Sequence, residues 1–219
     1  MFVLATTLAV VLAAPMVVEA QTPDTTRLPP TKPVDREYEI ALAKTAAPQV
    51  ISDNATIYVL GKRGYEIAVH GTNGYGCINQ RGLSGTALIP RCDEASGAEA
   101  LYPVFSLLEE MRADGKTVGD YRRAVADGYR TGKYRAPRQG GLSYMYSTDA
   151  VFLTSTGERV PFTPHVMIYW PYCTLKEIGV NEPAQMRETH LSLLDVGSPE
   201  CHLIVNTPPS TARTMTAQK

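Results

Sequence analysis

The sequence predicts an α+β fold: a single domain with a mainly antiparallel sheet, a two-helix insertion and a short N-terminal helix. The order of the elements is the main observation behind this prediction. Runs of β-type residues are grouped before and after two segments of helical periodicity, whereas parallel α/β folds alternate strands with helices. The composition agrees with a folded domain, since 44% of the residues are hydrophobic and 20% are charged.

The first part of the domain is expected to hold one helix and four strands. The helix spans residues 34–47, with Asp35 as its N-cap, and ends at Pro48. Glycines bound the turns between the strand runs, and the first two runs are predicted to form a hairpin. The four runs are residues 56–60, 65–70, 76–80 and 86–91.

Two helices are expected next. Pro103 suits a first helical position, and an apolar face follows it up to the stop at Asp114 and Gly115. Thr117 and Asp120 resemble a capping box that opens the second helix. Its predicted apolar stripe consists of Val118, Tyr121, Val125 and Tyr129. Later strands are expected at residues 142–147, 151–154, 166–170, 191–196 and 201–206.

The two ends of the chain differ in composition from the domain. Residues 1–20 are mainly apolar and end in Val18-Glu19-Ala20, which predicts a cleaved signal peptide. A positive n-region is missing before the apolar run, so an upstream start and an uncleaved membrane anchor are the alternatives. Residues 21–33 are rich in Pro and Thr and are expected to form a tether, and residues 207–219 a disordered tail. The single domain then covers residues 34–206.

Charge and cysteine content bear on the compartment. Residues 21–219 carry 21 basic and 21 acidic side chains, and this neutrality argues against nucleic-acid binding and against a polybasic membrane-surface protein. The four cysteines contain no C-x-x-C spacing, which favours disulfides over a zinc site. Of the three connectivities, we favour neighbour pairing: Cys77 with Cys92, and Cys173 with Cys201. We expect an exported protein, periplasmic or extracellular, without a membrane span once the signal is removed.

No sequence motif indicates a nucleophile, a metal or a cofactor. The chain lacks G-x-S-x-G, S-x-x-K, H-E-x-x-H and P-loop patterns, and we expect no cofactor and no metal. His165 and His202 open two strands that the Cys173–Cys201 pair would draw together, so they form a candidate acid–base or metal-binding pair, helped by Tyr144 or Tyr169. The alternative is that each histidine satisfies backbone groups at a strand end.

Two further segments are candidate ligand sites. A basic and aromatic tract at residues 121–138 would suit sugars, planar ligands or anionic cell-wall polymers. Alternatively, its tyrosines are a buried stripe and its arginines a solvated face. Asn73 lies in a glycine-rich turn that exposes backbone N–H groups to a ligand or simply leads into a disulfide. The candidate residues of the tract are Arg122, Tyr129, Arg130 and Arg135.

Several of these segments occur together in an order found elsewhere: HGTNGYGC at residues 70–77 with RCD at 91–93, LSYMYS at 142–147, PHVMIYWPY at 164–172, and SPECHLIV at 198–205. The chain resembles a group of exported bacterial proteins of unknown function that share a GTNG-x-x-C turn, a second Cys, a Y-M strand and a PHVM strand. The first cysteine pair recurs in that group, which supports Cys77–Cys92. No activity follows from the resemblance.

The sequence therefore favours a non-catalytic binding or structural module of the cell envelope, with a cell-envelope polymer or a small ligand as its partner. The alternative is a hydrolase or metal-dependent enzyme that uses His165 and His202. A short distance between the two histidines would favour the enzyme, and a separation of more than about 10 Å would remove its only candidate site.

Overall fold

The computed structural model describes residues 25–31, 34–149, 151–153, 159–161, 163–182 and 191–205. Eight strands form one sheet in the order β2-β1-β3-β4-β5-β8-β10-β9. Neighbouring strands are antiparallel except β1 and β3, which are parallel. The expected α+β class with a mainly antiparallel sheet is confirmed. The predicted signal peptide and C-terminal tail lie outside the described residues.

The strands lie on the expected runs, except that the fourth begins at Ile89 instead of residue 86 and that residues 159–161 form a strand that the sequence did not predict. In the large sheet they are β1 (Thr56–Leu60), β2 (Tyr65–Val69), β3 (Gly76–Gln80), β4 (Ile89–Asp93), β5 (Leu142–Met145), β8 (His165–Tyr169), β9 (Leu191–Leu194) and β10 (His202–Val205). A separate two-stranded sheet pairs β6 (Val151–Leu153) with β7 (Arg159–Pro161).

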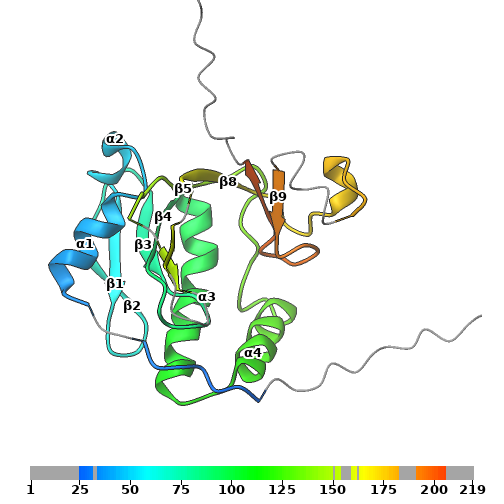
Figure 1. The fold of residues 1–219 in the computed structure, drawn as a ribbon, viewed down its shortest axis with the longest axis horizontal. Helices are drawn as coiled ribbons and strands as arrows, with labels where there is room; N and C mark the ends of the chain where they lie inside the picture. Colours follow the sequence, from blue (N-terminus) through cyan, green and yellow to red (C-terminus); the bar gives the residue numbers. More distant parts are fainter. Residues whose placement is uncertain are drawn as a thin grey trace, which may run out of the picture.

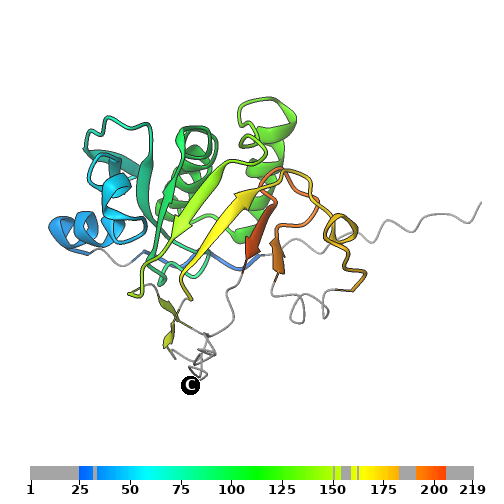
Figure 2. The same cartoon turned by 90° about the horizontal axis from the view of Figure 1, so that it is seen from above.

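Helices cover both faces of the sheet (Figures 1 and 2). One face of β1, β3 and β4 packs against α1, while α3 packs against β2, β3 and β4 from the other side. The helix α4 lies next to α3, on the same side of the sheet (Figure 2). The helices are α1 (Arg36–Lys44), α2 (Gln49–Ser52), α3 (Ala95–Ala113), α4 (Val118–Arg130) and the short 3₁₀ helix η1 (Leu175–Ile178).

Strand alternation divides the core into two layers. Side chains of successive strand residues point to opposite faces, so Ile57, Cys77 and Cys92 meet the alanines in and just after α1. Their neighbours along the strands, such as Ile78, meet α3 on the other face together with Tyr169. Both faces of the central strands are therefore buried, and any polar group placed there needs a partner.

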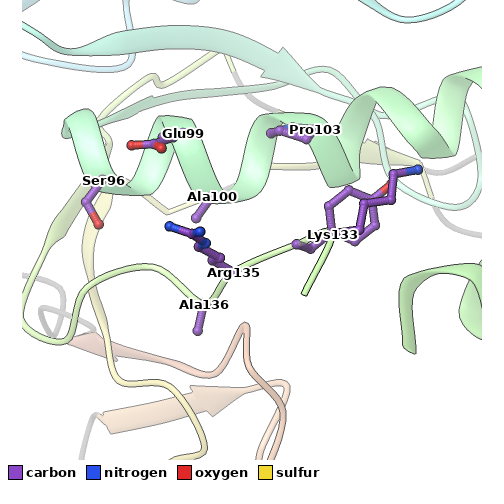
Figure 3. Close-up of a pocket in the computed structure, with 8 residues that line it drawn as sticks. Ser96, Glu99, Ala100, Pro103, Lys133, Arg135 and Ala136 are labelled. Carbon is purple, nitrogen blue, oxygen red and sulfur yellow. The ribbon is translucent and has the colours of Figure 1, made fainter. Parts of the chain in front are cut away.

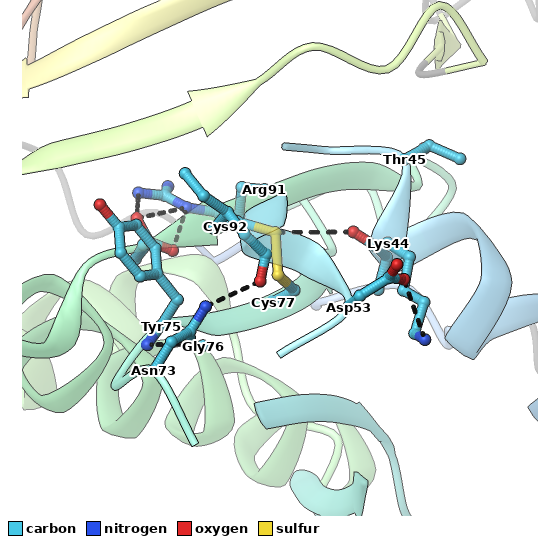
Figure 4. The surroundings of a disulfide bond; sticks show 12 residues. Lys44, Thr45, Asp53, Asn73, Tyr75, Gly76, Cys77, Arg91 and Cys92 are labelled. Atoms are coloured by element: carbon cyan, nitrogen blue, oxygen red, sulfur yellow. Dashed lines mark hydrogen bonds and ion pairs between the residues drawn. A yellow bond between two sulfur atoms is a disulfide. The ribbon is translucent and has the colours of Figure 1, made fainter. Parts of the chain in front are cut away.

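Both expected disulfides are present. Cys77 and Cys92 are directly opposite each other on β3 and β4, and the bond lies buried beneath α1 (Figure 4). Cys173 and Cys201 join the segment after β8 to the start of β10. Both are fully buried, and with Leu193 they form a small separate cluster. The disulfides therefore stabilise two separate parts of the sheet: one joins the central strands β3 and β4, and the other lies next to β8 and β10.

The helix α3 begins eight residues before the predicted start at Pro103. The Glu94 carboxylate caps the helix by accepting hydrogen bonds from the backbone N–H groups of Ser96 (3.0 Å) and Gly97 (3.2 Å). Pro103 lies inside the helix and removes one hydrogen bond, to the carbonyl of Glu99, without ending the helix. Burial of the α3 face on the sheet outweighs this loss.

The expected tether is in part docked on the domain. Leu28 is buried against Leu108 and Val118, and its N–H donates to the Lys116 carbonyl (2.9 Å). The Val118 N–H in turn donates to the carbonyl of Thr26 (2.9 Å). The composition of residues 21–33 did not predict this contact, because a single leucine supplies the apolar anchor.

The capping box of Thr117 and Asp120 at the start of α4 is confirmed.

Removal of the first disulfide tests how much it stabilises the sheet. We expect Cys77→Ala/Cys92→Ala to lower the free energy of unfolding by about 3 kcal/mol, because the unfolded chain regains the freedom of a loop of 15 residues. Urea unfolding measures the change. Thiol titration of the denatured, unreduced wild-type protein should find no free thiols. A loss below about 1 kcal/mol would contradict the expected role.

Candidate functional site

The two candidate histidines do not meet. In the antiparallel pair of β8 and β10, His202 is opposite Tyr169, while Val205 is opposite Val166. His165 thus lies four residues farther along the sheet, which at about 3.3 Å per residue is roughly 13 Å. The residues that open two antiparallel strands lie at opposite ends of the pair, and the expected approach of the histidines required parallel strands.

Each histidine instead satisfies a backbone group at the end of its strand. The Nδ1 atom of His165 is 2.7 Å from the Thr163 carbonyl, and that of His202 is 2.8 Å from the Glu200 carbonyl. Burial lowers the pKa of both imidazoles, which favours their neutral forms. Tyr144 is opposite Cys92 and therefore lies on the α1 face of the sheet, away from both.

Asn73 serves the turn that contains it. Its side-chain N–H donates to the Ile51 carbonyl (2.8 Å), and its side-chain oxygen accepts from the Tyr75 N–H (3.0 Å). Gly74 has a φ of 80°, which this turn requires and glycine adopts without strain. Both ends of the Asn73 amide are thus engaged with the backbone, as a structural role predicts.

The basic and aromatic tract divides between two pockets. Arg122 and Tyr129 line a large cleft beside α4. Arg135 lines a smaller pocket of about 290 Å³, where Figure 3 shows its guanidinium beneath α3 near Ala100. Arg130 forms an exposed ion pair with Asp127, with Nη2 and Oδ1 3.0 Å apart. The four tract residues therefore do not form one site.

We call the large depression the α4 cleft. Its volume is about 700 Å³, within the range of small-molecule sites. Three members of the apolar stripe predicted for the second inserted helix, Tyr121, Val125 and Tyr129, line it, while the fourth, Val118, is buried against Leu108. The walls come from α4 (Tyr121, Arg122, Val125, Ala126 and Tyr129), from α3 (Phe105 and Leu108), from the segment Gln80, Arg81, Gly82 and Leu83, and from Asp195, Ser198, Pro199 and Glu200.

A buried ion pair lies beneath the floor of the α4 cleft. The Arg91 side chain donates from Nε to Asp93 Oδ2 (2.9 Å) and from Nη2 to Asp93 Oδ1 (2.6 Å). The Tyr169 hydroxyl also donates to this carboxylate. Burial alone would raise the pKa of Asp93, but the Arg91 guanidinium and these hydrogen bonds outweigh it and hold the pKa below its usual range.

Arg91 connects this pair to the cleft. Its Nη1 donates to Gln80 Oε1 (2.9 Å), and its guanidinium lies 5.1 Å from the centroid of the Phe105 ring. Gln80 and Phe105 both line the α4 cleft, so two of its walls contact one fixed cation. The other arginine of the floor, Arg81, forms a buried ion pair with Glu39 (3.0 Å).

Carboxylates form the opposite wall. The Tyr129 hydroxyl donates to Glu200 Oε1 (3.1 Å). Burial, with the nearby charge of Asp195, raises the pKa of Glu200. Burial beside Glu200 likewise raises the pKa of Tyr129, which keeps the phenol protonated. This wall therefore presents a tyrosine hydroxyl and a carboxyl group that resists ionisation.

The spacing of Arg91 and Asp93 in the sequence could have predicted the buried ion pair. Arg91 and Asp93 are two residues apart on one strand and therefore share a face, and two charges on a buried face must be paired. The roles of Gln80 and Glu200 had no comparable local signal, because they depend on the packing of segments far apart in the chain.

Searches against protein-family models, curated proteins and solved structures found no match to this chain. Among the described residues, no three His, Cys, Asp or Glu side chains are grouped so that they could hold a metal ion.

Removal of one partner tests the buried pair. We expect Asp93→Asn to lower the free energy of unfolding by about 3–5 kcal/mol, because Arg91 remains buried without its counter-charge. The control Asp114→Asn removes an exposed pair with Arg63 and should cost about 0–1 kcal/mol. Urea unfolding compares both variants with the wild type. Equal losses in the two variants would contradict the account.

The raised pKa of Glu200 predicts a pH-dependent stability. The protonated carboxyl is favoured in the folded state, so this group stabilises the protein below its unfolded pKa and loses that contribution as pH rises through its folded pKa. Glu200→Gln cannot ionise, and its free energy of unfolding should increase relative to the wild type between about pH 4 and pH 7. The exposed Glu110→Gln serves as control. A difference that shrinks with rising pH would argue against burial as the cause.

Proposed function

We propose that this protein is an exported, non-catalytic binding module of the bacterial cell envelope that holds a neutral glycan in the α4 cleft. The observation that carries the proposal is an open cleft of about 700 Å³ that Tyr121 and Tyr129 of the aromatic stripe of α4 line, although Tyr121 also packs against Leu108 and Val118. Such a stripe on an amphipathic helix normally packs against the rest of the domain. Here Tyr121 and Tyr129 offer ring surfaces to a ligand.

The chemistry of the cleft suits a sugar chain. Sugar rings present C–H faces that pack on aromatic rings, and their hydroxyl groups need hydrogen-bond donors and acceptors at the edges. Tyr121, Tyr129 and Phe105 supply rings, while Gln80 supplies a polar group at the floor and Glu200 one at the opposite wall. A purely apolar ligand would leave these polar groups without partners.

The charges of the cleft favour a neutral glycan over an anionic polymer. The cation of Arg81 is compensated by Glu39, and Arg122 shares the cleft with Asp195 and Glu200. A polyanion would approach the carboxyl groups of Asp195 and Glu200 and gain little from Arg122, which lies among them. Of the ligand classes that the sequence left open, the anionic polymer is therefore the least suited.

Three observations support export. Disulfides persist in oxidising compartments, and the two in this chain are buried structural bonds. The apolar residues 1–20 and the resemblance to exported bacterial proteins point the same way. None of the helices in the described part of the chain has the length and apolar character needed to cross a bilayer.

The separation of the candidate catalytic groups supports the non-catalytic role. The hydrolase alternative required His165 and His202 to converge, and about 13 Å of sheet lies between them. Incubation with a bound oligosaccharide should therefore leave it uncut, as chromatography of the products would report. Shortened products would favour the hydrolase.

Substitution of Tyr129 tests the binding site. Calorimetric titration with β-1,4-linked tetramers of glucose and of N-acetylglucosamine should show binding of at least one, and Tyr129→Ala should weaken it about tenfold or more. Tyr129→Phe keeps the ring and should retain most of the affinity. Tyr38→Ala removes an exposed tyrosine of α1 and should bind as the wild type does.

Failure of both tetramers to bind the wild-type protein would overturn the proposed function. Tighter binding of polygalacturonate than of either tetramer would contradict the neutral ligand and favour an anionic polymer.

A further inference from the structure

The amide of Gln80 has a fixed orientation at the floor of the α4 cleft. Its oxygen accepts from Arg91 Nη1 at 2.9 Å. A guanidinium has donors only, so the amide cannot be reversed without placing two N–H groups against a cation. The side-chain NH₂ of Gln80 is thereby turned away from Arg91, and Gln80 lines the cleft. The floor offers the ligand a donor.

Arg91 itself is held in place. Asp93 accepts from two of its nitrogens, and 3% of Arg91 is exposed. The Phe105 ring packs against the same guanidinium at 5.1 Å. Because these contacts immobilise Arg91, the Gln80 donor is positioned before any ligand arrives, which lowers the entropic cost of binding.

An apolar wall adjoins this donor. Phe105, Leu108 and Leu83 line the same cleft as Gln80, and Phe105 shares its contact to Arg91. A ligand group that matches both features has a strong acceptor oxygen next to a small apolar substituent. The hydroxyl groups of a plain hexose supply no such substituent and would leave the apolar wall in contact with water.

We propose that Gln80 is a specificity-determining residue that selects an acetamido group, so that the glycan of the α4 cleft contains N-acetylated amino sugars. The acetamido carbonyl accepts from the Gln80 NH₂, and the methyl group packs on Phe105 and its apolar neighbours. This inference rests on the proposed function, because it names the substrate class of the same cleft. It adds a discrimination between glycans that the tyrosines alone do not supply.

Calorimetric titration of the whole protein with tetra-N-acetylchitotetraose and with cellotetraose tests the inference. These tetramers share their linkage and differ in the acetamido group. The wild type should bind the acetylated tetramer about tenfold more tightly or better. Gln80→Glu keeps the shape and the contact to Arg91 but replaces the NH₂ donor with an oxygen, and it should lose that preference.

A second variant guards against a change in folding. Gln80→Met has a similar length and neither donor nor acceptor, and it should lose the same preference; thermal unfolding reports whether either variant is folded. Equal wild-type affinity for the two tetramers, or a preference that survives in a folded Gln80 variant, would overturn this inference and leave the glycan site standing. Absence of binding to both tetramers would overturn the glycan site and this inference together.

Discussion

The buried ion pair between Arg91 and Asp93 is the constraint on which the rest of the structure depends. Both side chains lie in the layer between the sheet and α3, where an unpaired charge would cost several kcal/mol. The pair is stable only if its remaining hydrogen-bonding groups also find partners. Tyr169 from β8 donates to Asp93, and Gln80 from β3 accepts from Arg91, so one charge pair joins β3, β4 and β8.

The surroundings of this pair leave no room for larger side chains. A Cβ atom at Gly97 would overlap the Tyr169 ring, and a Cβ at Gly141 would lie 2.9 Å from it. Glycine at these positions lets the start of α3 and the segment before β5 approach the tyrosine closely. The α3 helix is thereby held against the sheet, while α4 is attached through its own N-terminal contacts to Leu28 and Leu108. The α4 cleft lies between α4, α3 and residues 80–83 and 195–200.

The sequence predicted what depends on local signals. The capping box at Thr117, the hairpin of β1 and β2, and both disulfide pairs agree with the structure. The predicted start of α3 was wrong for two reasons. Glu94 is an uncommon N-cap, and Pro103 is tolerated inside the helix because one helix face is buried against the sheet. The predicted histidine site was wrong for a non-local reason. The residues of β8 and β10 do not determine the order or the relative direction of these two strands in the sheet. The sequence predicted the tyrosine stripe of α4. It did not predict that the stripe lines a cleft, because that depends on how α4 packs against segments far apart in the chain.

Hydrogen–deuterium exchange with and without tetra-N-acetylchitotetraose tests the central claim most directly, because it locates the ligand without any substitution. The account predicts slower exchange in α4 (Val118–Arg130), in residues 80–83 and in residues 195–200, with no change in α1. Slower exchange confined to the smaller pocket around Ser96 and Arg135, or no change anywhere at saturating ligand, would contradict it.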